Sequence, residues 1–150
     1  MVRIERTTFK NDHFSGLVAK LDAYLSHTDG DEHDFYHQYN GIESLNQVVI
    51  AYIDDIAVGC GAIKRVDSIS VEVKRMYVSP ETRGQGIASL LLKELEEWAT
   101  ELKYKYCILE TGKRQPEAIA LYTKNKYQVI PNYGQYEGME NSVCFKKALT

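Results

Sequence analysis

The chain has 150 residues, the size of one ordinary domain, and 44% hydrophobic side chains, enough for a hydrophobic core. Its 18 basic and 21 acidic side chains leave a formal net charge of −3, which indicates neither a nucleic-acid footprint nor an anionic membrane partner. No apolar run is long enough to span a membrane, and the N-terminal residues lack the apolar core of a signal peptide. We therefore expect a single domain over residues 1–150, soluble and cytoplasmic.

The first third of the chain contains one strand pattern and one helix pattern. Residues 2–8 alternate as in a strand. Residues 12–26 place apolar side chains three and four positions apart, which predicts an amphipathic helix with Asn11 or Asp12 as its N-cap. Residues 27–41 are polar and aromatic without clean periodicity, and we predict a loop with a short helix near residues 32–38.

Histidines and acids are concentrated in the same segment, residues 27–41. His33 and His37 are four positions apart and would share one face of a helix, as two metal ligands do. No obvious third ligand accompanies them, and acidic, histidine-rich surface loops are ordinary. We therefore predict no metal site.

Three strands are predicted in the middle of the chain. Residues 47–52 and 56–64 have strand patterns and are joined by a short hairpin connection at Asp54 and Asp55. The second contains Gly59 and Gly61, which indicate a bulge or a close approach of another segment. Residues 71–78 form the third, so we predict an antiparallel meander.

A glycine-bearing turn follows this third strand. Pro80 ends the strand, and residues 83–88 (Arg-Gly-Gln-Gly-Ile-Ala) lead into a helix with leucines at helical spacing. Glycines let the backbone approach a ligand, while the first free amides and the helix dipole favour an anion such as phosphate. An ordinary turn before a helix explains these glycines equally well, and the spacing matches neither common nucleotide loop.

The last third of the chain alternates strands and helices. Residues 104–111 predict a strand parallel to the central one, because a helix connects the two. A helix over residues 116–125, a strand over 127–130, a loop rich in Tyr and Gly, and a strand over 142–147 follow. We predict an α/β (α+β) fold with a mixed sheet of about six to seven strands and helices on both faces.

The chain has three widely spaced cysteines, Cys60, Cys107 and Cys144, each in an apolar, strand-like run. Their spacing does not match a metal site. Burial raises the pKa of a thiol, so we interpret them as small buried hydrophobic residues and not as reactive thiols.

Three segments together resemble the GNAT N-acetyltransferase family. Residues 83–88 are similar to the segment that binds the pyrophosphate of acetyl-CoA through backbone amides, and residues 76–81 are similar to the strand and turn before it. Residues 117–122 (Glu-Ala-Ile-Ala-Leu-Tyr) are similar to the helix that ends in the family's tyrosine. The resemblance covers about residues 46–147 and implies the GNAT fold and acetyl-CoA as co-substrate. Homodimers are common in the family.

The resemblance also implies where acetyl-CoA binds. In the family, the strands corresponding to residues 71–78 and 105–111 splay apart, and the pantetheine arm lies in the gap between them. Gln115 stands where many relatives carry an Asn that hydrogen-bonds the cofactor, so the chain departs from the family pattern there. The implied cofactor-binding residues are Met76, Val78, Arg83, Gly84, Gln85, Gly86, Ile87, Ala88, Ser89 and Gln115.

Two residues are candidates for catalysis. Tyr122 matches the family tyrosine near the CoA sulfur, which implies a proton donor; from spacing alone, packing at a helix end is the alternative. Glu72 precedes Arg83 by the same offset as the catalytic glutamate of the histone-acetylating branch, which implies a general base. An ion-paired glutamate beside Lys74 is the alternative. Strand alternation predicts that Glu72 shares a face with Lys74 and Met76.

The acceptor side is implied by position in the family. The segment with Glu32 lies where GNAT proteins vary the connection between their first helices, and an acid there would attract a cationic amine. Tyr133 and Tyr136 would form walls of the pocket and Glu137 would hold a second charge, although ordinary loop residues are an equal explanation.

The function that follows is transfer of an acetyl group to the primary amine of a small-molecule or amino-acid-like acceptor. The family usually transfers directly in a ternary complex, and we favour this over an acetylated Cys107 or Cys144. Protein or peptide acetylation, for which Glu72 is the main indication, and a CoA-binding module without turnover are the alternatives.

Overall fold

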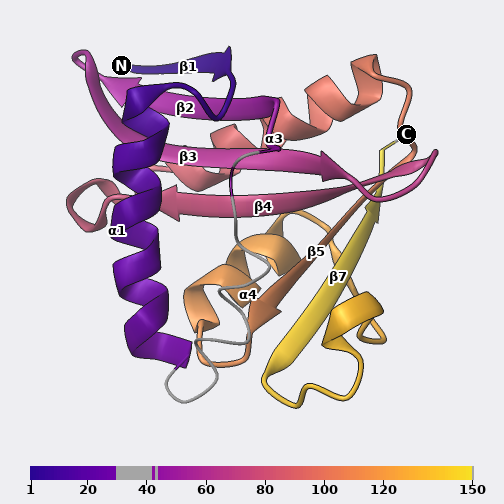
Figure 1. Cartoon of the computed structure of the whole chain (residues 1–150). Helices are drawn as coiled ribbons and strands as arrows, with labels where there is room; N and C mark the ends of the chain where they lie inside the picture. Colours follow the sequence, from indigo (N-terminus) through magenta and orange to yellow (C-terminus); the bar gives the residue numbers. More distant parts are fainter. Residues whose placement is uncertain (30–41, 43, 150) are drawn as a thin grey trace.

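The computed structural model describes residues 1–29, 42 and 44–149, which form a seven-stranded sheet with helices on both faces (Figure 1). The strands are β1 Val2–Thr7, β2 Gln47–Ile53, β3 Ile56–Arg65, β4 Ser70–Val78, β5 Tyr106–Gly112, β6 Gln128–Ile130 and β7 Ser142–Ala148. The helices are α1 Asp12–Asp29, α3 Ile87–Glu101 and α4 Pro116–Lys124, with short 3-10 turns η2 Pro80–Thr82 and η3 Gly134–Tyr136.

The strand order is β1-β2-β3-β4-β5-β7-β6. Strands β1 to β4 pair antiparallel in sequence, β4 and β5 pair parallel, and β7 pairs antiparallel with both β5 and β6. The predicted meander, the parallel pair and the α/β fold class are therefore confirmed. The predicted short helix near residues 32–38 lies outside the described residues.

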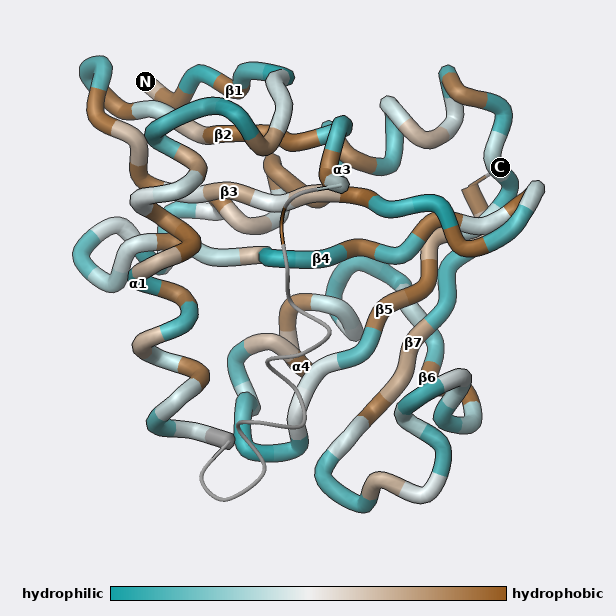
Figure 2. Tube along the Cα trace, in the orientation of Figure 1, coloured by the Kyte–Doolittle hydropathy of each residue, from teal (hydrophilic) through white to brown (hydrophobic). Residues whose placement is uncertain are grey.

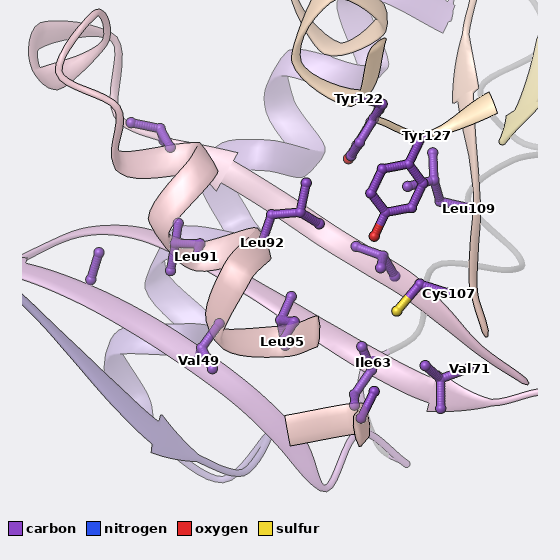
Figure 3. Packing of buried hydrophobic residues seen from close by; sticks show 14 of the residues in the cluster. Val49, Ile63, Val71, Leu91, Leu92, Leu95, Cys107, Leu109, Tyr122 and Tyr127 are labelled. Carbon is purple, nitrogen blue, oxygen red and sulfur yellow. The ribbon is translucent and has the colours of Figure 1, made fainter. Parts of the chain in front are cut away.

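Different helices cover the two faces of β2 to β4. On one face, α1 buries Phe14, Leu17 and Leu21 in a cluster with side chains from these strands. On the other, α3 packs Leu91, Leu92 and Leu95 in a second cluster (Figure 3). Helical spacing brings these leucines onto one stripe, and each fully buried leucine stabilises the fold by about 1.5–3 kcal/mol.

Strand β4 contains a bulge opposite Gly61. Its pairing with β3 shifts between Cys60 and Ala62, so that Arg75 and Met76 together oppose Gly61. Arg75 takes a left-handed conformation with φ 59°. A Cβ on Gly61 would lie 2.4 Å from the Met76 Sδ. The predicted close approach at Gly61 is confirmed, and the extra residue of this bulge belongs to β4. A bulge in β3 itself is also present beside Gly59, because the pairing of β2 with β3 shifts between Ala51 and Tyr52 and leaves Val58 without an opposite residue.

The bulge reverses the side-chain alternation along β4. Val73 packs in the cluster under α3, and Met76 packs against the same cluster. Glu72 and Lys74 alternate with Val73 and lie on the opposite face. The prediction that Met76 shares a face with Glu72 and Lys74 is therefore wrong, because the bulge inserts one residue between them. Polar side chains make the middle of β4 hydrophilic within a largely apolar sheet (Figure 2).

Strands β4 and β5 separate along their length. Their ladder consists of three pairs, from Ser70 with Tyr106 to Glu72 with Ile108. Beyond Glu72 the two strands diverge, as Figure 1 shows between the labels β4 and β5. The splayed pair that the resemblance implied is present, and it opens toward the glycine-bearing turn that follows Val78.

Candidate active site

The turn between β4 and α3 presents backbone amides at the open end of this gap. Gly84 and Gly86 have φ of 83° and 76°, values that other residues rarely adopt. Gly86 caps α3 and accepts the Leu90 amide at 3.1 Å, so the amides of residues 87–89 precede the first helical bond. Such amides have no acceptor within the helix, and with the positive end of the helix dipole they can bind an anion.

Cationic side chains flank this turn. The Arg83 Nε donates to the Val78 carbonyl oxygen at 3.0 Å, which fixes the guanidinium stem beside the end of β4. Lys124, at the end of α4, also lines the cleft. The neighbouring Asn125 donates from its Nδ2 to the Ser89 Oγ at 3.1 Å, which ties the end of α4 to the start of α3.

A cleft of about 560 Å³ extends from this turn into the gap between β4 and β5. Its walls come from α1, β4, the turn, α3, β5 and α4. The predicted cofactor-binding residues that line it are Met76, Val78, Arg83, Gly84, Gly86, Ile87, Ala88, Ser89 and Gln115. Gln85 is exposed and does not line the cleft. A volume of this size and a cradle of free amides fit a nucleotide-bearing co-substrate.

Gln115 occupies the N-terminus of α4. Its backbone amide donates to the Gly112 carbonyl oxygen at 3.0 Å, and its half-buried side chain makes no capping hydrogen bond. Gln115 therefore lies at the cleft in the place that the resemblance gives to Asn. Its side chain carries the amide group one methylene further from the backbone than Asn would.

Glu72 is buried on β4 and lines the cleft. Its Oε2 accepts a hydrogen bond from the Tyr133 hydroxyl at 2.6 Å, and its Oε1 lies 3.5 Å from the Lys74 Nζ. The ion pair with Lys74 that the sequence suggested is present, and Glu72 also faces the cleft. Buried carboxylates need such partners, because an unpaired buried charge is strongly unfavourable.

Tyr122 lies at the other side of the gap. It comes from α4, is 6% exposed, lines the cleft, and packs its ring against Tyr127 and Phe145 with centroid distances of 5.7 and 5.8 Å. Burial, followed by the negative charge of Glu110, raises the pKa of Tyr122 above its ordinary value of 10.0. The hydroxyl therefore stays protonated at neutral pH and can donate a proton.

The residues predicted for the acceptor side have different places. Tyr136 is buried and lines the cleft, whereas Tyr133 hydrogen-bonds to Glu72 and does not line it. Glu137 is exposed and lies off the cleft. Glu32 lies outside the described residues, as do His33 and His37. Within the described part of the chain, no three potential metal ligands come together.

Lys74 and Glu110 are among the charged residues of the cleft that sequence reasoning did not assign to the site; Arg75, Glu117 and Lys124 are the others. Glu110 lies two residues beyond Ile108, the partner of Glu72, so the two carboxylates stand on the same face of the two diverging strands. Lys74 was named only as a neighbour of Glu72. Lys74 is two positions from Glu72 on the same strand, so strand alternation could have indicated it. No sequence signal places Glu110 beside Glu72.

The three cysteines are fully buried, and none lines the cleft. Burial raises the pKa of Cys60 and of Cys107 to about 12 and that of Cys144 to about 11. Thiols in this state are poor nucleophiles. Their interpretation as buried hydrophobic residues is confirmed.

Comparison with known proteins gives a family and a fold. Residues 14–127 match the model of the acetyltransferase (GNAT) family. An IAA acetyltransferase from Azospirillum brasilense is 31% identical, over 99% of this chain and 98% of that protein. A crystal structure from Klebsiella pneumoniae, assigned to the acyl-CoA N-acyltransferases, is 31% identical with a TM-score of 0.84, covering 100% of this chain and 99% of that one.

A more distant structure contains a ligand. The GNAT-family acetyltransferase from Elizabethkingia anophelis, with acetyl-CoA bound, has 19% identity and a TM-score of 0.68, covering 98% of this chain and 97% of that one. This likeness concerns the fold.

Across the described residues, no helix is both long and apolar enough to cross a membrane.

Proposed function

The chain belongs to the acetyltransferase (GNAT) family, and we propose that it transfers the acetyl group of acetyl-CoA to the primary amine of a small-molecule or amino-acid-like acceptor. Transfer occurs by direct attack in a ternary complex. The observation that carries this proposal is the cleft between β4 and β5, which joins a cradle of free amides to the buried pair Glu72 and Tyr122.

The groups along the cleft indicate how acetyl-CoA would be oriented in it. The amides of residues 87–89, with Arg83 beside them, would hold the diphosphate. The unpaired edge of β4 near Met76 and Val78 would hydrogen-bond the pantetheine arm, because β5 has diverged there. About 20 Å of strand separates Val78 from Glu72, at about 3.3 Å per residue, so the reacting end would lie near the closed end of the gap.

Carboxylates favour a cationic acceptor at this closed end. Glu72 and Glu110 stand on the same face of the two strands and both line the cleft. An amine with a pKa near 10.4 is mostly protonated at pH 7, and freeing its lone pair costs about 4.6 kcal/mol. A buried carboxylate that attracts the ammonium group and accepts its proton lowers this barrier.

The proposed residue roles balance the protons of the transfer. Glu72 takes one proton from the ammonium group, and the freed lone pair forms the C–N bond while the C–S bond breaks. Tyr122 gives its hydroxyl proton to the departing thiolate. The second proton of the nitrogen restores Tyr122 through solvent, and Glu72 releases its proton to water. None of the cysteines lines the cleft, which supports direct transfer over an acetylated cysteine.

A thiol-release assay with acetyl-CoA tests this proposal. The panel contains small primary amines, amino acids, lysine peptides and IAA, the last because an IAA acetyltransferase is a relative. We expect turnover with one or more small amines, and calorimetry should detect coenzyme A binding. A response to peptides alone would contradict the proposed acceptor class. Coenzyme A binding without turnover on any acceptor would indicate a binding module.

A further inference from the structure

We propose that Tyr133 is a positioning residue, which holds the Glu72 carboxylate in place for proton transfer and does not itself contact the acceptor. This inference rests on the proposed function. The Tyr133 hydroxyl donates to the Glu72 Oε2 at 2.6 Å across 61 residues of sequence. Tyr133 does not line the cleft, whereas Glu72 does. It therefore reaches the chemistry through the carboxylate.

The loop between β6 and β7 holds Tyr133 firmly. Its ring packs edge-to-face against Tyr136, with centroids 5.7 Å apart and planes at 88°, in a cluster that includes Cys144. Burial, and then the charge of Glu72, raise the pKa of Tyr133. The hydroxyl remains protonated at neutral pH and is available as a donor.

The Glu72 carboxylate is thus held at both oxygens. Tyr133 donates to Oε2, and the Lys74 Nζ lies 3.5 Å from Oε1. Glu110 of β5 stands on the same face and lines the same cleft, and the charge of Glu72 is one of the causes that raise the pKa values of Tyr136 and Cys144. Both are neutral at pH 7, because their pKa values are raised. Lys74 and Tyr133 therefore stabilise the ionised carboxylate, and Tyr133 does so from another element.

Removal of the Tyr133 hydroxyl should leave the Glu72 carboxylate less well positioned and more readily protonated, without disturbing the cofactor. The Oε2 would lose its donor inside a buried site, which disfavours the charged carboxylate. The acid limb of kcat/KM reports protonation of the base, so we expect this limb to move to higher pH in Tyr133→Phe. We expect kcat near neutral pH to fall about tenfold, with acetyl-CoA affinity unchanged.

The matched control is Tyr127→Phe. Tyr127 is buried and, like the half-buried Tyr133, donates to a glutamate, with 2.9 Å between its hydroxyl and the Glu96 Oε2. Neither Tyr127 nor Glu96 lines the cleft. This variant loses a comparable hydrogen bond and should keep the wild-type pH profile. In a Glu72→Gln background, Tyr133→Phe should cause no further loss of kcat, because Tyr133 acts through the carboxylate.

The experimental outcomes distinguish a failure of the positioning role of Tyr133 from a failure of the proposed acetyltransferase function. A wild-type protein without turnover on any acceptor overturns both. Wild-type turnover together with an unshifted acid limb in Tyr133→Phe overturns the positioning role alone. An equal shift in Tyr127→Phe, or an additive loss in the Glu72→Gln background, also overturns it.

Discussion

Glu72 and Tyr122 reach the gap between β4 and β5 from opposite faces of the sheet. Glu72 lies on the face away from Val73 and α3, whereas Tyr122 belongs to the cluster that α3 covers, with Leu109. Both nevertheless line one cleft, because the strands no longer pair there. The proposed base on one face and the proposed acid on the other suit a transfer in which the acceptor and the donor approach from different sides.

Replacement of Tyr122 by Phe should lower kcat at least about tenfold, because a positioned general acid typically contributes about 10²–10⁴-fold. The Phe ring keeps the packing against Tyr127 and Phe145, so binding of acetyl-CoA should be retained. Burial raises the pKa of Tyr122, so its titration should not lower wild-type kcat up to about pH 9. Thiol release measures kcat and calorimetry measures binding. Wild-type turnover in Tyr122→Phe would remove it from the mechanism.

The sequence indicates a single site residue only where that residue belongs to a local sequence motif or has a fixed spacing from one. Tyr122 ends a family motif and Glu72 has the family's offset from Arg83, so the resemblance implies both as candidates, and both line the cleft. The bond from Tyr133 to Glu72 joins residues 61 positions apart, and no local pattern encodes it. Glu110 likewise depends on strand register, which one sequence does not specify in advance.

At the scale of elements, the bulge in β4 determines which side chains face each side of the cleft. The alternation of Glu72, Lys74 and Met76 is regular in the sequence, yet Met76 lies on the other face. The glycine in the neighbouring strand was a sign of the distortion, but it could not tell which strand contains the extra residue. Register follows from packing on both faces, and it is the part of the fold that local patterns predict least well.

Gly61→Ala should test the importance of this bulge. The new methyl would lie 2.4 Å from the Met76 Sδ and 3.0 Å from the Leu95 Cδ1, so Met76 must move within the wall of the cleft. We expect a loss of about 1–3 kcal/mol in unfolding free energy, typical of overpacking. Denaturant unfolding measures the loss, and calorimetry should show weaker binding of acetyl-CoA.

Gly16→Ala provides the control for this change. Gly16 lies in α1, where an added Cβ would meet nothing within 4 Å, and alanine at a compatible helical position typically stabilises by about 0.5–1 kcal/mol. Its acetyl-CoA affinity should equal that of the wild type. Equal stability and affinity in Gly61→Ala would show that the bulge adjusts to a side chain without affecting the cleft.

At the scale of the whole molecule, the sheet has two parts that meet at a short seam. Strands β1 to β4 form one part and β5, β7 and β6 the other, joined by the three pairs that begin at Ser70 and Tyr106. The cluster under α3 extends across the seam, since it includes Val71 from β4 and Cys107 from β5 (Figure 3). Periodicity predicts the helices and strands along the chain, whereas the continuity of the hydrophobic cluster across the seam depends on tertiary packing. We propose that the chain unfolds as one domain.

Thiol labelling can test this cooperativity, because Cys60 lies in one part and Cys107 and Cys144 in the other. All three are buried, with pKa values raised from 9.0 to about 12, 12 and 11. Since the folded-state values are raised, their contribution to stability is present below about pH 9 and is lost as the pH rises through the folded values. At about pH 8 we expect slow labelling at one common rate, measured by mass spectrometry, and slower still with coenzyme A bound. Fast reaction of Cys107 and Cys144 with Cys60 protected would mean that the part containing β5 to β7 opens independently.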